Sequence, residues 1–95
     1  MKRVTAVAFP ANPHLESACD LGKAMRAART QAGLRIQDAA LALGMATQTL
    51  TDIESGKPTV SLGKVLDAAR GLGVDLFALP RRKRDAALQR LADLK

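Results

Sequence analysis

The chain is 95 residues long, carries a formal net charge of +6 and contains one cysteine. This length allows one small domain, and a lone cysteine excludes an internal disulfide or a cysteine-based zinc cluster. The positive charge favours a polyanionic partner, nucleic acid first and an anionic membrane surface second, although a merely soluble basic protein has the same composition. With no tryptophan or tyrosine and two phenylalanines, a base-stacking platform for single strands or RNA is disfavoured.

The residue pattern does not suggest an enzyme, and we expect no metal and no cofactor. His14 is the only histidine and lies in a proline-rich stretch, and no nucleophile has a base partner at a usable spacing. No acidic, histidine and cysteine set has metal-ligand spacing, and no glycine-rich phosphate loop occurs. The apolar run near the start is too short for a signal peptide or a membrane span and is interrupted by Pro10 and Glu16, so we expect a cytoplasmic protein.

Residues 1–16 form an N-terminal lead-in. The stretch Val4–Phe9 is rich in β-forming residues and ends at Pro10, which predicts either a short strand or a loose tail. A single strand is not stable by itself, so a strand here would need a partner, such as one from a second subunit.

The helical body spans residues 17–73 and begins with a capping box, in which Ser17 is the N-cap and Asp20 folds back on the first turn. The first helix that follows is predicted to end at Gly33, and Cys19 is interpreted as a small apolar core residue. Apolar residues at helical spacing define its buried face: Leu21, Ala24, Met25, Ala28 and Ala32.

Two short helices follow, separated by Gly44, which permits the left-handed backbone of a tight turn. The first of them repeats the apolar spacing at Ile36, Ala39, Ala40 and Leu43. The second has an apolar seam of only two residues, Leu50 and Ile53, and short polar side chains elsewhere. That pattern suits a helix that faces a ligand, although an ordinary exposed polar helix looks the same. In a basic chain it suggests a probe for the major groove of DNA.

A fourth helix is predicted after its N-cap Ser61, closed by Gly71 and Gly73. Its inward residues are Leu62, Val65, Leu66, Ala69 and Leu72. Residues 74–95 then form a tail in three parts. Val74–Leu79 predicts a second short strand, stopped by Pro80, and Arg81–Arg84 is either a solvated basic run or a phosphate contact. Asp85 is expected to cap a last helix that bears Leu88, Leu91 and Leu94.

Residues 21–73 resemble the Xre/Cro-type helix-turn-helix domain of phage and bacterial repressors. The matching features are Gly33-Leu34, Ala40 with Gly44, Leu50 with Ile53–Lys57, and Ser61-Leu62 through Leu72–Val74. The resemblance implies a mainly α fold with a four- to five-helix repressor-like domain. The β-rich stretches add one or two short β-strands at the termini, which we expect to pair across a dimer. A strand that follows the last body helix, such as Val74–Leu79, is similar to the equivalent strand of HipB-like antitoxins.

Carried over residue by residue, the resemblance makes the helix at 47–54 the recognition helix. It places Thr47, Gln48, Thr51 and Asp52 toward base edges, and Arg35, Gln37, Ser55 and Lys57 near phosphates. It also implies a structural ion pair between Arg29 and Glu54. The chain departs from the family at Arg35-Ile36, where Thr-Gln is usual, and at Ala46, which replaces a hydroxyl cap. Thr47 could cap instead, which would take it away from the bases.

The function that this resemblance implies is a sequence-specific repressor that binds a palindromic double-stranded DNA operator as a homodimer. The similarity to HipB-like proteins adds an antitoxin role, in which the protein neutralises a kinase-like toxin and represses its own operon. A stand-alone phage-type or metabolic repressor with no toxin partner is the alternative.

Overall fold

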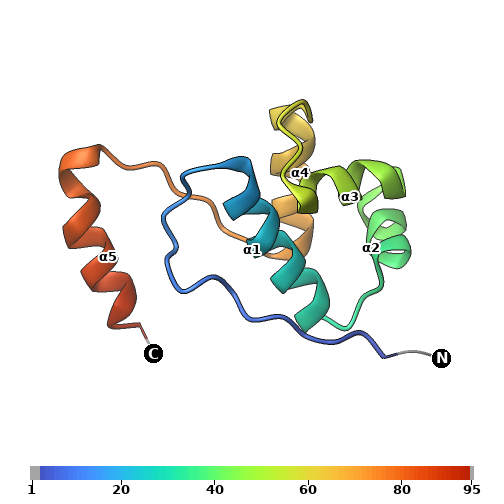
Figure 1. The fold of residues 1–95 in the computed structure, drawn as a ribbon, viewed down its shortest axis with the longest axis horizontal. Coiled ribbons are helices and arrows are strands. Elements are labelled where there is room, and N and C mark those ends of the chain that lie inside the picture. The colour runs from blue at the N-terminus through green and yellow to red at the C-terminus, as the bar shows by residue number, and fades with distance from the viewer. Residues whose placement is uncertain (1–2, 95) are drawn as a thin grey trace.

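Four helices pack together in the computed structural model, which describes residues 3–94, and a fifth helix stands apart from them (Figure 1). The body consists of α1 (Ala18–Gln31), α2 (Ile36–Leu43), α3 (Thr47–Ser55) and α4 (Leu62–Leu72). An extended segment then leads to the 3-10 helix η1 (Arg81–Lys83) and to α5 (Arg84–Ala92). No helix within the described range is long and apolar enough to cross a membrane.

The start of α1 is the predicted capping box, which the structure confirms. The Asp20 N–H donates to Ser17 Oγ at 3.3 Å, and the Asp20 carboxylate accepts the N–H groups of Ser17 at 3.2 Å and Glu16 at 2.9 Å. These donors, the Glu16 N–H above all, lower the pKa of the Asp20 carboxyl because they favour its charged form.

The core is built largely from small side chains. Met25 and Leu50 are its largest fully buried members. Among residues 3–94, Ile53 and five alanines complete the buried apolar set: Ala27, Ala39, Ala40, Ala68 and Ala69. Small residues let helices approach closely, and a Cβ added to Gly22 of α1 would collide with the Ile53 and Glu54 carbonyls of α3. Helix α3, the candidate recognition helix, therefore packs closely against α1.

A tight turn sets α3 across α2. Gly44 ends α2 in the left-handed conformation at φ 68°, as expected for the predicted turn. The next N–H, that of Met45, donates to the Ala40 carbonyl at 3.0 Å. This turn carries the chain from α2 directly into α3, which begins two residues later.

Neither predicted strand forms, so the expectation of terminal β-strands is wrong for residues 3–94. Val4–Phe9 runs instead as an extended strap along α1. The Val7 N–H donates to Thr30 Oγ1 at 3.0 Å, and Gln31 Nε2 donates to the Val7 carbonyl at 2.9 Å. Side chains of a helix, rather than a neighbouring strand, satisfy this backbone. Val74–Leu79 is likewise extended without a ladder partner, because strand-forming residues make a strand only where another segment pairs with them.

Two smaller predictions also fail. Cys19 is exposed at the start of α1, where its thiol lies 3.9 Å from the Ser55 carbonyl, and is not a core residue. Asp85 lies in the first turn of α5, whereas Lys83 occupies the N-cap position without a side-chain bond.

The buried face of α4 is partly as predicted, since Ala69 is buried and Val65 and Leu72 pack against the core, but it differs at the other predicted positions. Ala68 is fully buried, while Leu62 and Leu66 are exposed to 70% and 41%. The core next to α4 has room for alanines, so packing against α1 and α2 decides which face of this helix is buried.

Candidate nucleic-acid interface

Helix α3 buries one face and exposes the other. Leu50 and Ile53 anchor it in the core, and it packs on both α1 and α2. Thr47, Gln48 and Thr51 are exposed. Because residues three or four apart share a face of a helix, these side chains form one polar strip on the side opposite the core. The strip gives the domain a rigid polar edge rather than a flexible loop.

The side chains of Gln48 and Asp52 are linked within this strip. Gln48 Nε2 donates to Asp52 Oδ1 at 2.8 Å, and Lys57 Nζ lies 3.7 Å from Asp52 Oδ2. The Asp52 side chain is only 21% exposed, so it sits beneath its two partners. Gln48 keeps one N–H and its Oε1 free for a ligand. This contact was not among the predictions, although the i,i+4 spacing of Gln48 and Asp52 is the pattern that indicates it.

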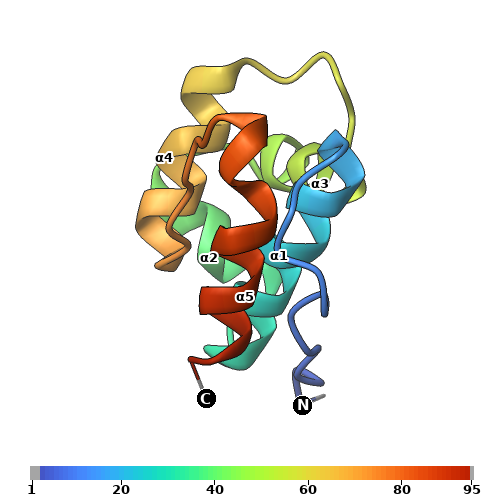
Figure 2. The ribbon, with the colours of Figure 1, turned by 90° about the vertical axis from the view of Figure 1, so that its left-hand side faces the viewer.

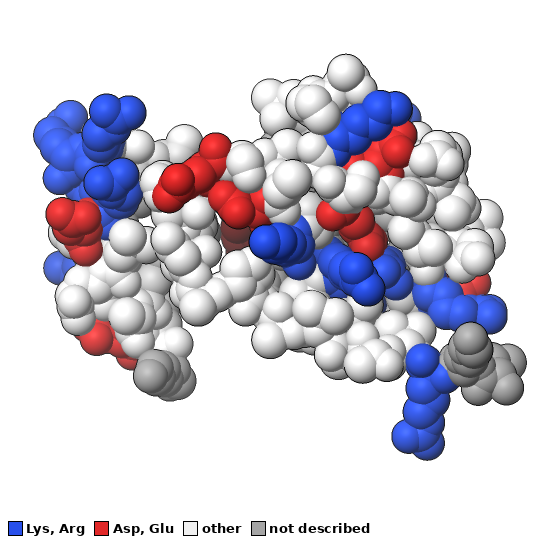
Figure 3. Space-filling model, viewed as in Figure 1, with Lys and Arg blue, Asp and Glu red and all other residues white. Residues whose placement is uncertain are grey.

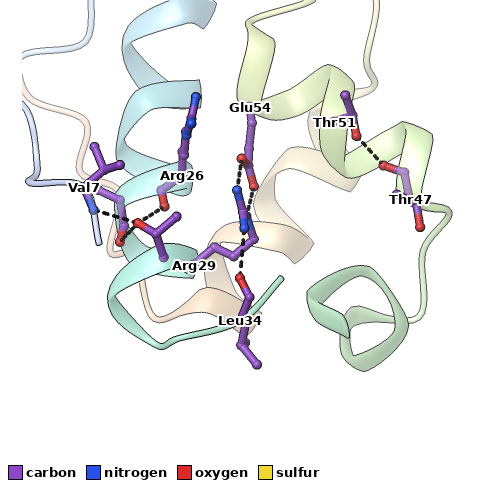
Figure 4. A network of polar contacts seen from close by, with 9 residues as sticks. Val7, Arg26, Arg29, Leu34, Thr47, Thr51 and Glu54 are labelled. Atoms are coloured by element: carbon purple, nitrogen blue, oxygen red, sulfur yellow. Dashed lines mark hydrogen bonds and ion pairs between the residues drawn. The ribbon is translucent and has the colours of Figure 1, made fainter. Parts of the chain in front are cut away.

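The two threonines of the strip differ in what they offer. The Thr51 hydroxyl donates to the Thr47 carbonyl at 2.9 Å (Figure 4), so it presents a lone pair and a methyl group to solvent. Ala46 is the N-cap of α3, which makes Thr47 the first helical residue and not a cap. Its exposed side chain is therefore available at the start of the strip.

The N-termini of the four body helices fall into two kinds. Ser17 and Ser61 cap α1 and α4 with side-chain hydrogen bonds. Arg35 and Ala46, the N-cap residues of α2 and α3, make no such bond. Within residues 3–94 the first N–H groups of α2 and α3 therefore have no capping side chain, and such groups with their helix dipole attract anions.

The candidate phosphate contacts lie at the ends of α2 and α3. Arg35 precedes α2 and pairs with Asp38 at 3.2 Å, and Gln37 follows in the first turn. Ser55 ends α3, donating its hydroxyl to the Asp52 carbonyl at 3.1 Å, and Lys57 follows the turn. All four side chains belong to exposed residues.

A buried ion pair holds α3 to α1. Arg29 donates to Glu54 through Nε at 2.6 Å and Nη2 at 2.9 Å, and its Nη1 donates to the Leu34 carbonyl at 2.8 Å (Figure 4). The two side chains are 10% and 8% exposed. The two-pronged geometry fixes the orientation of α3 and ties the loop after α1 to it, so this pair is architectural.

Comparison with known proteins gives a consistent picture. A family model described as a helix-turn-helix domain matches residues 20–81. The chain is 32% identical over 72 residues to an uncharacterized HTH-type transcriptional regulator, y4mF, of Sinorhizobium fredii, covering 74% of this chain and 95% of that protein.

Solved structures with the same fold include chains from a HipA-HipB-O2-O3 complex and from a HipB-O4 20mer complex. Each matches with a TM-score of 0.64 at 19% identity, covering 72% of this chain and 96% of the other. At this identity the likeness concerns the arrangement of the helices.

Proposed function

This chain belongs to the helix-turn-helix family of DNA-binding transcriptional regulators, and from that premise we propose that it is a sequence-specific repressor. In this proposal it binds a palindromic double-stranded operator as a homodimer. The observation that carries the proposal is the polar strip of α3, a short helix anchored by Leu50, Ile53 and the Glu54 ion pair and exposed along its other face. The major groove of DNA accepts one such helix.

Base recognition is assigned to the strip. Gln48 is placed to bind adenine, accepting from the adenine N6 amine through Oε1 and donating its free N–H to N7. Asp52 takes the other N–H of the Gln48 amide and so fixes which way that amide points. Thr51 offers its methyl group to a thymine, and Thr47 offers its hydroxyl to either base edge. Asp52 thus acts on the bases mainly through Gln48, since its side chain is only 21% exposed.

Phosphate contacts frame the strip. Arg35 and Lys57 supply cationic donors, and Gln37 and Ser55 supply neutral ones. The uncapped N–H groups of α2 and α3 add further donors for phosphate oxygens. These contacts set the position of α3 on the duplex and carry no sequence information, so they make the affinity depend on salt.

The proposed homodimer follows from the short length of α3. A helix of nine residues reads only a few base pairs, and a two-fold pair of them reads a palindrome with half-sites about one helical turn apart. A two-fold axis in the protein matches the two-fold axis of such an operator.

An antitoxin role is a second candidate function, in which the protein also binds a kinase-like toxin and represses its own operon. The observation that favours it is the shared fold with the HipB chain of a HipA-HipB-O2-O3 complex. The lead-in and α5 lie largely outside the family match at residues 20–81 and offer surface for a protein partner. Co-expression with a kinase-like neighbour of the gene, followed by co-purification, separates this role from that of a stand-alone repressor.

Mobility-shift assays with the DNA upstream of the protein's own gene test the primary proposal. We expect a specific complex that survives excess random duplex at physiological salt, and an affinity that falls steeply as salt rises, because bound phosphates release counterions. A scrambled duplex of the same length and base composition is the control. Equal affinity for both duplexes would reject the claim of sequence specificity.

A further inference from the structure

An apolar groove of about 800 Å³ lies between α5, the lead-in and the first turns of α1. The extended segments 9–15 and 74–81 line it, together with Leu21 of α1 and Leu88 and Leu91 of α5. Figure 2 views the molecule from the α5 side, where α5 stands in front of the body and the extended segments run beside it. Helix α5 has no buried residue, so the contact between α5 and the body is incompletely packed in the described part of the chain.

The groove gathers exposed apolar side chains. Phe77 is 82% exposed, Leu79 56% and Phe9 47%, and all three line the groove. A phenylalanine side chain buries about 150–250 Å² when it packs, so Phe77 and Phe9 alone leave roughly 250 Å² of packable surface in water. Leu15 and Leu91, which are also exposed, line the same groove, so these apolar side chains are gathered in one place.

Charges of both signs face each other across the groove. Asp20 of α1 and Asp75 of the extended segment after α4 supply the acidic wall, and Arg81 of η1 and Arg84 of α5 supply the basic wall. Figure 3 shows one cluster of lysines and arginines at the α5 end, acidic side chains between that end and the body, and further basic side chains over the body. No ion pair joins the two walls within residues 3–94, and the recorded partner of Arg84 is its neighbour Asp85 at 3.8 Å.

We propose that a second copy of this chain occupies the groove. A two-fold rotation places the basic wall of each copy against the acidic wall of the other, so the charge complementarity is satisfied twice and the apolar side chains of both copies leave water. A nucleic acid in the groove would meet Asp20, Asp75 and an apolar floor, whereas an acidic protein would meet two carboxylates. The surface is complementary to itself.

The position of the groove suits this partner. In Figure 1 α5 lies at one end of the long axis and α2 and α3 lie toward the other, and the molecule extends 44 Å along its longest axis. Association through the groove leaves the polar strips of both copies free for DNA. This inference rests on the homodimer of the proposed function and names its surface.

A charge exchange tests the pairing. Sedimentation velocity of the full chain without DNA is expected to show dimers at micromolar concentration. Asp75→Arg and Arg84→Asp should each raise the dimer dissociation constant about tenfold or more, because each brings like charges together. An equimolar mixture of the two variants should associate again, since position 75 of each copy then faces an opposite charge at position 84 of its partner.

Phe77→Ala should weaken dimers by a similar factor, while Leu62→Ala on α4 is the matched control, an exposed apolar residue outside the groove. Circular dichroism and melting in the same buffer verify that each variant is folded. A monomeric wild type overturns this inference and the proposed homodimer together. A dimer that resists every groove variant, or a mixture that fails to associate, overturns this inference alone. Operator binding, measured separately, tests the DNA-binding proposal.

Discussion

Gln48 is the residue whose substitution separates base reading from phosphate contact. Its amide is oriented by Asp52 and leaves one donor and one acceptor for a base. We expect Gln48→Ala to cost about 1–3 kcal/mol on the preferred operator and to relax the preference at one base position. Lys57→Ala, the phosphate-contact comparison, should weaken all duplexes alike and reduce the salt slope by about one. Binding isotherms on single-base operator variants measure both effects.

A double substitution tests whether Asp52 acts on the bases by orienting the Gln48 amide. Asp52→Ala should lower specificity in a wild-type background but add little once Gln48 is already alanine, because the carboxylate acts on bases through that amide. If the two substitutions are additive on the preferred operator, Asp52 contacts the DNA independently of Gln48.

A second prediction at this scale concerns the buried ion pair. Glu54→Gln removes the charge partner of Arg29 at a site where both side chains are about one-tenth exposed. We expect the free energy of unfolding to fall by about 3–5 kcal/mol, since the guanidinium is left buried and uncompensated. Asp38→Asn, which breaks the half-exposed pair with Arg35, should cost only about 0–1 kcal/mol. Chemical denaturation compares the two, and equal midpoints for Glu54→Gln and wild type would contradict a structural role.

At the scale of elements, substitutions at the helix N-caps should affect the stability of the fold and its affinity for DNA differently. Ser17→Ala should cost about 1 kcal/mol of stability and change DNA affinity less than a charge at the start of α3 does, because α1 packs on the core side of α3 and not on its polar strip. Ala46→Asp adds a cap to α3 in a backbone conformation typical of N-caps and should stabilise the fold by about 1 kcal/mol. The added carboxylate should nevertheless weaken DNA binding through phosphate repulsion. Thermal melts and mobility shifts on both variants provide the measurement, and stronger binding by Ala46→Asp would place the start of α3 away from DNA.

The capping box also predicts a pH dependence. Hydrogen bonds from the Glu16 and Ser17 N–H groups lower the pKa of Asp20 in the folded chain. A lowered folded pKa means that its contribution is present above the unfolded value of about 3.9 and is lost as the pH falls through the folded value. Asp20→Asn should therefore reduce stability near neutral pH and flatten the acid limb of the stability curve. Identical acid limbs for Asp20→Asn and wild type would contradict this account.

At the scale of the whole molecule, the four-helix body and the α5 arm should behave as separable parts. Helix α5 has nine residues and buries none of them, so deleting residues 81–95 should change the monomer's free energy of unfolding little. The same deletion should abolish self-association if the groove is the dimer surface. Denaturation at low protein concentration and sedimentation at high concentration measure the two effects, and a large loss of monomer stability would show that α5 is part of the folding unit.

The local features of the body were determined by the sequence itself. The capping box at Ser17 and Asp20, the left-handed turn at Gly44 and the core positions Met25, Leu50 and Ile53 all followed from spacing and residue type. The hydrogen bonds and caps of a helix join residues within about four positions of each other, so the local sequence is enough to predict them. The site assignments on α3 came from the family resemblance and stay predictions.

Tertiary structure alone decided the remainder. Val4–Phe9 and Val74–Leu79 have the composition of strands, but a strand needs a partner segment distant in sequence, and neither finds one within residues 3–94. The strap from Val7 to Thr30 and Gln31 joins residues more than twenty positions apart, which no local pattern encodes. The burial of Ala68 in place of Leu66 likewise depended on the space that α1 and α2 leave beside α4, because close packing decides which face of a helix fits.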